Sequence, residues 1–474
     1  MAQAKQYPLI IGGEQVYTKE TRPVYNKYDG SLYATISVAG REETDRAVAA
    51  AKQAFESTYF DVATRYSVLM RAGELMRERQ AELAEILIRE TGKTVQDANN
   101  EVLWSLDLFT ESAEEAKRIH GETVCFPVPW LDTRTCYTRR EPIGVVAAIT
   151  PFNFPLNLAV HKLAPALAAG NAVILKPAEA TSVIGYKLCE ILIDAGVPKG
   201  FVSCLLGQGQ YIGDYLTQNP DIGFYSFTGS VPVGKKIKES IGLRRCALEL
   251  GSNSATIVCK DFDIEKAASA CVDAAYSNAG QVCISLQRIY ADRAIFAPFV
   301  ERVVELSKAK VCGDPSDPGT EIGPMISLKD AERAIAWIAE AEQAGATVHC
   351  GNRREGSVVW PTVLTGVKRD MKVMESETFA PIVSIVPFDT MEEAYAMVND
   401  SRYGLNSGIL TNDLSVAMEA IQKLKTGGVI VGGTCGFRFG NMPYGGIKES
   451  GIGREAPKYA IEEMTELKTV VILN

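Results

Sequence analysis

The sequence predicts an α/β protein with two parallel β-sheets whose strands are joined by helical crossovers. The chain has 474 residues, which is too long for a single hydrophobic core and indicates two or three domains. Short β-rich runs alternate with helical stretches through most of the chain, a pattern typical of parallel strands connected by helices. The series restarts near residue 250, so we expect one α/β unit on each side of that point.

The first α/β unit is expected between residues 142 and 250. Its β-rich runs predict strands over 142–150, 171–176, 201–206, 223–228 and 246–250. The stretches between them predict helices over 157–169, 181–195, 210–217 and 233–241. For the second unit we expect strands over 255–259, 288–291, 383–388, 406–410 and 428–431. Its expected helices cover 265–278, 298–309, 329–344 and 391–399.

The chain before residue 120 is expected to be mostly helical after a short β-rich start. Three stretches there have amphipathic spacing and are expected to pack around the first sheet, namely 42–55, 65–90 and 95–119. Two isolated β-like runs, 134–139 and 468–473, fall outside both units. We expect them to be edge strands of a protruding ribbon that pairs with another subunit.

The composition is that of a soluble globular enzyme. Hydrophobic residues make up 46% of the chain, charged residues 23%, and the net charge is −9. No cluster of Lys and Arg forms a nucleic-acid footprint, so we expect no nucleic-acid partner. The longest strongly apolar runs, such as 143–149, are too short to span a bilayer, and residues 1–7 lack a secretory pattern. These features predict a cytoplasmic protein without a membrane partner.

The cysteines do not predict a metal site. The eleven cysteines are scattered without a Cys-x-x-Cys pair, and the chain has three histidines. An odd number of cysteines in a large chain points to a reducing compartment.

Two glycine-containing turns suggest a dinucleotide site in the first unit. Gly207-Gln208-Gly209, with Gly213, follows an expected strand and precedes an expected helix, and Phe227-Thr228-Gly229-Ser230 lies in the same context. Backbone amides at such a helix start can face a pyrophosphate. Either turn alone also fits a simple tight connection between strand and helix.

Lys176 and Glu179 follow another expected strand, at the edge where α/β sheets bind ligands. A carboxylate there can accept both hydroxyls of an adenosine ribose and would repel a 2′-phosphate, which favours NAD over NADP. The alternative is a surface ion pair at a helix cap.

Cys283 and Glu249 are the candidate chemical groups. Cys283 follows the turn-forming residues Asn278-Ala279-Gly280-Gln281, which could keep a thiol reachable. Glu249 follows apolar residues, and burial would raise its pKa toward the range of a general base. Cys283 could instead be a small hydrophobic side chain packed in a core, and Glu249 could instead cap a helix or form an ion pair.

Seven ordered motifs resemble those of the NAD(P)-dependent aldehyde dehydrogenase superfamily along almost the whole chain. They are Pro151-Phe152-Asn153-Phe154-Pro155, Lys176-Pro177-Ala178-Glu179, Phe227-Thr228-Gly229-Ser230, Glu249-Leu250-Gly251, Gly280-Gln281-Val282-Cys283, Glu377-Thr378-Phe379-Ala380-Pro381 and Pro443-Tyr444-Gly445-Gly446-Ile447-Lys448-Glu449-Ser450-Gly451. The sequence departs from the usual pattern at Phe152 (often Trp), Ser252 (often Gly) and Ala380 (often Gly), and none of these changes removes a catalytic group.

The resemblance implies a Rossmann-like cofactor domain (1–122 and 143–249), an α/β catalytic domain (250–450) and a small β bridging or oligomerisation ribbon (123–142 and 451–474). Cys283 would form a thiohemiacetal and then a thioester, with Asn153 and the Cys283 amide as oxyanion hole. Glu249 would activate the hydrolytic water, and Lys162 and Glu455 would form a proton relay. Implied cofactor contacts are Thr150, Pro151, Phe152, Lys176, Glu179, Gly209, Gly213, Phe227, Gly229, Ser230, Leu250, Glu377 and Phe379. A homodimer or homotetramer is the usual assembly.

The residues expected to line the substrate pocket predict a short polar or anionic aldehyde. They are His161, Arg438, Trp104, Tyr444, Val282 and Ile284. Arg438 and His161 replace aromatic residues, and an Arg fork suits an anion, although Arg438 could instead point to solvent. The aldehydes considered are lactaldehyde, sulfolactaldehyde and a semialdehyde, oxidised with NAD, with NADP possible.

Three rival functions remain. A non-phosphorylating glyceraldehyde-3-phosphate dehydrogenase is disfavoured because Trp104 and Val282 stand where those enzymes tend to place Arg. A CoA-acylating enzyme tends to lack the base that Glu249 supplies. A structural or binding protein on the same scaffold would not need Cys283, Asn153 and Glu249 together.

Overall fold

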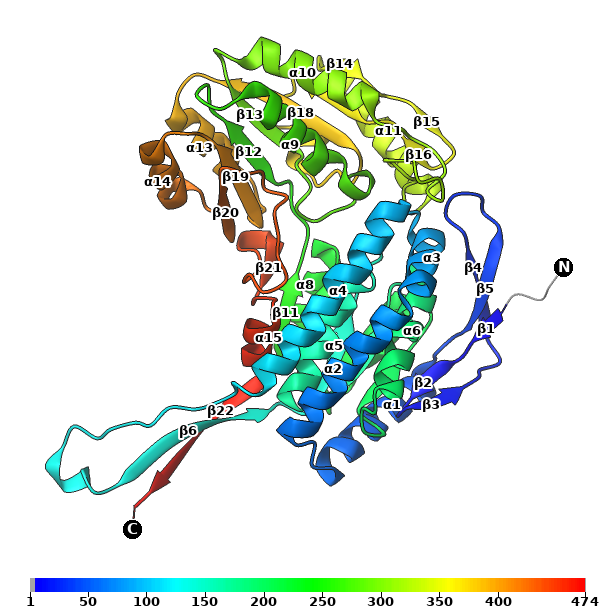
Figure 1. Cartoon of the computed structure of the whole chain (residues 1–474), viewed down its shortest axis with the longest axis vertical. Coiled ribbons are helices and arrows are strands. Elements are labelled where there is room, and N and C mark those ends of the chain that lie inside the picture. The colour runs from blue at the N-terminus through cyan, green and yellow to red at the C-terminus, as the bar shows by residue number, and fades with distance from the viewer. Residues whose placement is uncertain (1–4, 474) are drawn as a thin grey trace.

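The computed structural model describes residues 5–473 and contains two large sheets, each in a body of its own (Figure 1). The first sheet has eight strands in the order β21-β11-β10-β7-β8-β9-β2-β3, and the second has seven in the order β14-β17-β18-β13-β12-β19-β20. The predicted α/β fold with two units is confirmed. The first four of residues 1–7 lie outside the described residues.

Five parallel strands form the centre of the first sheet. They are β7 (Val145–Ile149), β8 (Ala172–Lys176), β9 (Val202–Cys204), β10 (Phe224–Thr228) and β11 (Arg245–Glu249). The helices between them are α5 (Asn157–Ala169), α6 (Ser182–Asp194), α7 (Gly209–Gln218) and α8 (Val231–Ser240). The strands read as continuous apolar runs because both faces of the sheet are covered. Their carboxyl ends meet at one edge, which positions the residues that follow each strand.

Antiparallel strands close the two edges of this sheet, namely β2 (Leu9–Ile11), β3 (Glu14–Val16) and β21 (Gly451–Ile452). A separate three-stranded sheet near the N-terminus contains β1 (Lys5–Tyr7), β4 (Thr21–Tyr25) and β5 (Leu32–Ser37). The strands β1 to β5, of three to six residues each, were expected only as a β-rich start of the chain.

Four helices near the N-terminus pack beside the first sheet (Figure 1). They are α1 (Arg41–Ser57), α2 (Val62–Glu78), α3 (Gln80–Thr91) and α4 (Val95–Ala116). The prediction of one helix over 65–90 is wrong, because Arg79 adopts φ −102° and ψ 15° and ends α2 where α3 begins. The break lets each helix bury its own apolar face, through Leu75 in α2 and Leu87 in α3.

The second sheet has six parallel strands and one antiparallel edge strand. The parallel strands are β12 (Ala255–Val258), β13 (Arg288–Asp292), β17 (Thr362–Thr365), β18 (Ile382–Phe388), β19 (Asn406–Leu410) and β20 (Gly428–Val431). The edge strand is β14 (Thr347–Cys350). The helices of this body are α9 (Ile264–Tyr276), α10 (Phe296–Ala309), α11 (Leu328–Gln343), α12 (Lys372–Glu375), α13 (Met391–Asn399) and α14 (Leu414–Lys423).

Several short elements of the second body were not expected. They are β14, β15 (Arg354–Glu355), β16 (Val358–Val359), β17, α12 and α14. Strands of two to four residues are too short to show a period in the sequence, and their partners decide that they form.

The two isolated β-like runs form one ribbon within the chain. β6 (Thr135–Pro142) pairs antiparallel with β22 (Thr465–Ile472) over its whole length, and the ribbon projects from the first body in Figure 1. The helix α15 (Pro457–Glu463) leads into β22. The prediction of a continuous strand over 142–150 is wrong, since Gly144, with φ +114°, turns the chain between β6 and β7.

Candidate active site

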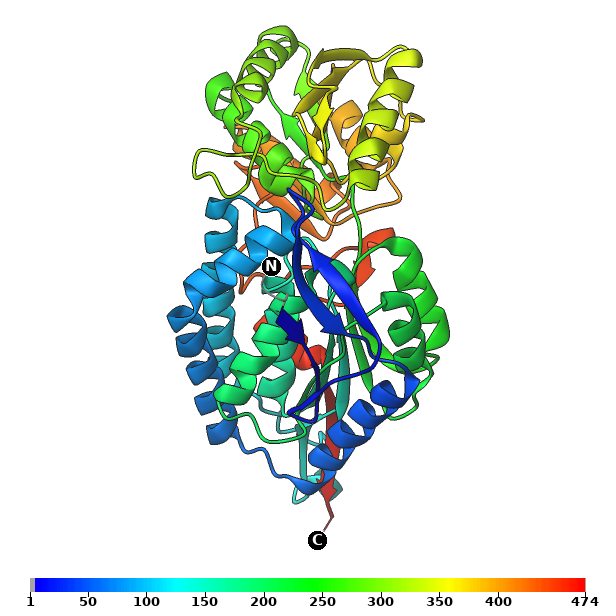
Figure 2. The same cartoon turned by 90° about the vertical axis from the view of Figure 1, so that its right-hand side faces the viewer.

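The site lies where the carboxyl edge of the first sheet faces the second body, and Figure 2 shows the two bodies one above the other. A cavity of about 180 Å³ opens here, and Cys283 lines it. All six residues predicted for the substrate pocket line the same cavity: Trp104, His161, Val282, Ile284, Arg438 and Tyr444. The wall also includes residues that sequence reasoning missed, among them Asp107, Phe154, Asn157, Leu158 and Phe439.

A left-handed turn presents Cys283 to this cavity. The expected helix over 265–278 is wrong at its end, because α9 stops at Tyr276 and Asn278 and Ala279 have φ values of 50° and 55°. Gly280 follows with φ 72°, and a Cβ there would lie 2.2 Å from the carbonyl oxygen of Ala380. Only glycine therefore fits this close approach of two backbone segments.

The Cys283 thiol is partly buried and contacts one hydroxyl group. Its Sγ lies 2.7 Å from Oη of Tyr444. Burial raises the pKa of Cys283 to about 11, although the Tyr444 hydrogen bond and the Arg438 charge act to lower it. The thiol is therefore protonated near neutral pH, and its use as a nucleophile requires a base.

Glu249, at the end of β11, is the candidate base for that proton. Its side chain is buried, and within residues 5–473 neither oxygen finds a hydrogen-bond partner. Burial and the negative charge of Glu455 raise the pKa of Glu249 well above its usual range. A Cβ at Gly445 would lie 2.8 Å from Oε1, so the loop after Tyr444 packs closely on this carboxylate.

Asn153 follows β7 and joins the turn that carries Cys283. Its Nδ2 donates to the carbonyl oxygen of Gln281 at 3.0 Å, which uses one of its two amide hydrogens. Lys93 donates to the carbonyl oxygen of Asn153 and pairs with Glu101 at 3.3 Å. Lys93 and Glu101 were not singled out from the sequence, because nothing in the local sequence marks this charged pair as buried.

Lys162, Glu455, Arg438 and His161 form one buried polar chain beside the cavity. Nζ of Lys162 lies 2.6 Å from Oε1 of Glu455 and 2.7 Å from Oγ1 of Thr228. Arg438 Nη2 lies 3.1 Å from Oε2 of Glu455 and 3.1 Å from Nε2 of His161. The structure thus joins residues separated by almost 300 positions in the chain.

Burial and neighbouring charges shift the pKa values of Glu455 and His161 in this cluster. Burial acts to raise the pKa of Glu455, but the Lys162 and Arg438 cations outweigh it and lower that pKa. Burial and the nearby Arg438 charge lower the pKa of His161 to about 3, so the imidazole is neutral. The guanidinium of Arg438 lies 3.7 Å from the ring centre of Tyr444 and faces inward, not to solvent.

The residues expected to contact a dinucleotide from the first body follow the carboxyl ends of five strands, β7 to β11. Lys176 ends β8, and burial lowers its pKa to about 8. Glu179 follows in the 3-10 turn Glu179–Thr181, and Gly209 begins α7. The remaining residues of this edge are Thr150, Pro151 and Phe152 after β7, Phe227, Gly229 and Ser230 at the end of β10, and Leu250 after β11. Gly213 lies one turn inside α7, and within residues 5–473 a Cβ added there would have open space beyond its chain neighbours and its own helix backbone.

Unused polar groups at this edge fit a nucleotide. The hydroxyl of Ser230 stands at the N-terminus of α8 without capping it, and the buried hydroxyl of Thr150 has no hydrogen-bond partner within residues 5–473. From the second body, Glu377 accepts a hydrogen bond from the amide of Ser252 at 3.0 Å, and burial raises its pKa to about 7. The ring of Phe379 packs edge-on against Phe152, with 5.8 Å between ring centres.

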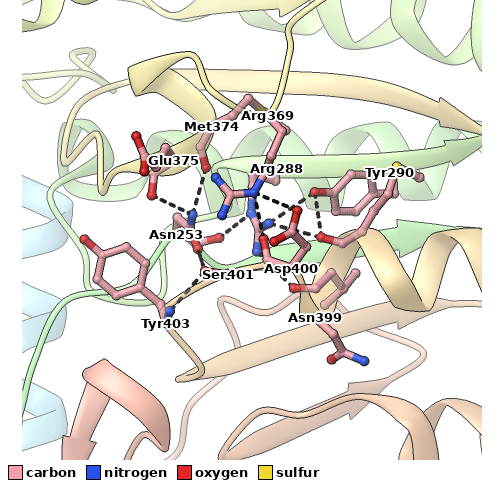
Figure 3. Close-up of polar contacts among 12 residues, drawn as sticks. Asn253, Arg288, Tyr290, Arg369, Met374, Glu375, Asn399, Asp400, Ser401 and Tyr403 are labelled. Atoms are coloured by element: carbon pink, nitrogen blue, oxygen red, sulfur yellow. Dashed lines mark hydrogen bonds and ion pairs between the residues drawn. The ribbon is translucent and has the colours of Figure 1, made fainter.

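A polar network around the buried residues Asn253 and Arg288 holds the chain at Met374, shortly before Glu377 in the sequence (Figure 3). Arg288 Nε donates to the carbonyl oxygen of Asn253 at 2.7 Å, and Nη1 donates to Oη of Tyr290 at 3.1 Å. The side-chain Nδ2 of Asn253 donates to the carbonyl oxygen of Met374 at 2.8 Å. Asn253 is thereby held from both sides, and it holds the chain three residues before Glu377.

Among residues 5–473, no group of three or more His, Cys, Asp or Glu side chains could hold a metal ion. In the same part of the chain, no helix has the length and apolar character needed to cross a membrane.

Known proteins resemble this chain over its whole length. It is 49% identical to 3-sulfolactaldehyde dehydrogenase of Priestia aryabhattai over 475 aligned positions, which cover 100% of this chain and 99% of the relative. Aldehyde dehydrogenase 21 of Physcomitrella patens, solved with the reaction product succinate, superposes with a TM-score of 0.97 at 33% identity and 100% and 99% coverage. Glyceraldehyde-3-phosphate dehydrogenase GapN of Methanocaldococcus jannaschii, solved with NADP, gives a TM-score of 0.93 at 37% identity and 96% and 100% coverage.

The model of the aldehyde dehydrogenase family matches residues 15–470. This chain therefore belongs to the aldehyde dehydrogenase family, whose members are NAD(P)-dependent oxidoreductases.

Proposed function

We propose that this enzyme oxidises a short anionic aldehyde, with 3-sulfolactaldehyde as the first candidate, to the carboxylate. One observation carries the proposal: Arg438 and a neutral His161 line the same small cavity as the Cys283 thiol. The cavity volume of about 180 Å³ suits a small aldehyde, and the guanidinium offers a positive charge to an anionic end.

The proposed chemistry begins with a proton transfer. Because the thiol of Cys283 has a pKa of about 11, Glu249 takes its proton as Sγ attacks the aldehyde carbon. The remaining amide hydrogen of Asn153 and the backbone amide of Cys283 stabilise the negative oxygen, and one such donor contributes about 3 to 4 kcal/mol. A bound NAD(P)+ would supply the hydride acceptor, and loss of the hydride from the carbon attached to Sγ would leave a thioester on Cys283.

Hydrolysis of the resulting thioester completes the proposed reaction. Glu249 activates the water, and its carboxylate needs a route for the proton that it accepts. The ion pair of Lys162 and Glu455 lies next to it and is proposed as that route. Thr228 accepts a hydrogen bond from Lys162 and holds the ammonium group in place.

Three of the similar proteins support an anionic substrate, because their names or ligands contain a sulfonate, a dicarboxylate and a phosphate. Other relatives, at 37–39% identity, are lactaldehyde dehydrogenases, whose substrate is neutral, so lactaldehyde is the second candidate substrate. Trp104 and Val282 offer no second cation for a phosphate, so we propose a sulfonate or carboxylate rather than glyceraldehyde 3-phosphate. A CoA-acylating reaction is the second candidate reaction and is disfavoured by Glu249, which we propose as the base that activates water. Acyl-CoA formation after addition of CoA would favour that alternative.

The substrate proposal is tested with a matched pair of aldehydes. Lactaldehyde and 3-sulfolactaldehyde differ by the sulfonate, and kcat/KM is measured for both with the unchanged enzyme, Arg438→Ala and Arg438→Lys. A charged hydrogen bond contributes about 1.5 to 3 kcal/mol, so Arg438→Ala is expected to lower kcat/KM for the sulfonate about 10- to 150-fold more than for lactaldehyde. Arg438→Lys is expected to retain part of the difference. An equal loss for both aldehydes would show that Arg438 does not recognise the anion.

The domain division, the assembly and the location are also proposals. We propose a cofactor domain over 1–122 and 143–249, a catalytic domain over 250–450 and a bridging ribbon over 123–142 and 451–474. Exposed apolar side chains on the ribbon, such as Leu467 and Ile472, support a homodimer or homotetramer. Sedimentation of the chain without residues 465–474 tests that assembly. The eleven free cysteines support a cytoplasmic location, which cell fractionation tests.

A further inference from the structure

A residue from the N-terminal region enters the edge of the sheet that is proposed to bind the adenosine ribose. Arg22 lies on β4, and its Nη1 is 2.8 Å from Oε1 of Glu179. In the amide orientation that satisfies its neighbours, the side-chain oxygen of Gln208 accepts from Nη1 at 2.7 Å and from Nη2 at 2.8 Å. One guanidinium therefore bridges the segments that follow β8 and β9.

This contact changes what the charge of Glu179 implies about the choice of cofactor. An isolated carboxylate at this place would repel a 2′-phosphate, and that repulsion is the sequence argument for NAD over NADP. Here an Arg offsets the charge of Glu179 directly. The pair is held loosely, because the two side chains are 32% and 45% exposed, and such exposed pairs stabilise a fold by about 0 to 1 kcal/mol. A stronger anion can therefore take the guanidinium from Glu179.

The surroundings of Arg22 suit a phosphate. Its guanidinium is a planar fork that can pair with two phosphate oxygens at once. Lys176 lies at the same edge, where its Nζ would be 3.6 Å from a Cβ added at Gly209. One further carboxylate is close, since Oε1 of Glu20 lies 3.8 Å from Nε of Arg22, and this pair does not use the Nη atoms that contact Glu179 and Gln208.

We propose that Arg22 determines cofactor specificity: it leaves Glu179 to pair with the 2′-phosphate of NADP, so that the enzyme accepts both cofactors. With NAD bound, Arg22 stays on Glu179, and the carboxylate accepts the ribose hydroxyls. This inference rests on the proposed function, because it needs Glu179 to face the adenosine ribose.

The test measures binding without any aldehyde. Dissociation constants for NADP+ and NAD+, and for the smaller probes 2′,5′-ADP and 5′-ADP, are determined by calorimetry for the unchanged enzyme and for variants. Arg22→Ala is expected to weaken NADP+ and 2′,5′-ADP about tenfold or more, because the 2′-phosphate then loses its charged hydrogen bonds to the guanidinium and faces only the carboxylate of Glu179. NAD+ and 5′-ADP are expected to change less than about threefold. Arg22→Lys is expected to recover part of the loss, since it restores the charge without the fork.

Arg71→Ala is the matched control. Arg71 is an exposed arginine of α2 that pairs with Glu74 at 2.9 Å, so its removal changes the net charge equally without touching the sheet edge. It is expected to leave both cofactors unchanged, and retained NAD+ binding in Arg22→Ala shows that this variant is folded.

Two results are decisive. If Arg22→Ala leaves the ratio of NADP+ to NAD+ affinity unchanged while aldehyde oxidation persists, the Arg22 assignment is overturned and the proposed function stands. If the unchanged enzyme binds no dinucleotide, the proposed function fails and the assignment fails with it.

Discussion

Replacing Tyr444 with Phe is expected to slow the reaction of Cys283 with an alkylating reagent. The change removes the hydroxyl that lies 2.7 Å from Sγ but keeps the ring under Arg438. A hydrogen bond to a charged group contributes about 1.5 to 3 kcal/mol, and about 1.4 kcal/mol corresponds to one pKa unit. The pKa of the thiol, already about 11, is therefore expected to rise by about one to two units.

The size of the rate change follows from two opposing effects. Each unit of pKa lowers the thiolate fraction about tenfold at a pH below the pKa, while the more basic thiolate is about threefold more nucleophilic. The rate at fixed pH is therefore expected to fall about 3- to 12-fold over one to two units.

The assay is the rate of carboxamidomethylation of Cys283 by iodoacetamide between pH 6 and 9, followed by mass spectrometry of the peptide that contains it. Cys283→Ser gives the background from the other cysteines, of which Cys125 is exposed. Tyr59→Phe, at a side chain 90% exposed, is the matched control and is expected to change nothing. A Tyr444→Phe enzyme that alkylates as fast as the unchanged enzyme, or faster, would show that the hydroxyl does not stabilise the thiolate.

Three other changes test the site. Glu249→Gln is expected to abolish turnover and to raise the melting temperature, more at pH 8 than at pH 5. Because the pKa of Glu249 is raised in the folded protein, this carboxyl ionises first in the unfolded chain as pH rises above about 4.5. That ionisation favours the unfolded chain, and the Gln variant no longer has this loss of stability. An equal gain at both pH values in a calorimetric scan would contradict that reasoning. Gly280→Ala is expected to lower the free energy of unfolding by about 1 to 3 kcal/mol and to remove most of kcat, because alanine would have to adopt φ 72° with its Cβ against the Ala380 carbonyl oxygen. Urea unfolding measures the stability and a kinetic assay measures kcat. An unchanged kcat would refute the close approach. Arg288→Met is expected to raise KM about tenfold, equally for NAD and NADP, because loss of the Arg288 bonds loosens the segment before Glu377. Arg288→Lys is the control. A change in KM for only one cofactor would show that Arg288 does not act through that segment.

Much of the site could be predicted because its residues follow strands. Apolar runs and glycine turns locate the carboxyl ends of β8, β10 and β11, and parallel strands place those ends at one edge. Cys283 and Glu249 could be named because small and apolar neighbours mark them. Lys93 and Glu101 could not, because a buried ion pair looks like any helix surface until its burial is known.

The sequence by itself determined the α/β class, the order of the main elements and the choice of Cys283 as the candidate thiol, since periodicity and turn residues are local properties of the chain. Only the tertiary structure decided the charge state of that thiol, the inward direction of Arg438 and the contact between Arg22 and Glu179. These depend on burial and on distances between residues that lie far apart in the chain, and a local pattern contains neither. The pairing of β6 with β22 is of the same kind, because strands more than 300 residues apart meet only when the whole chain has folded.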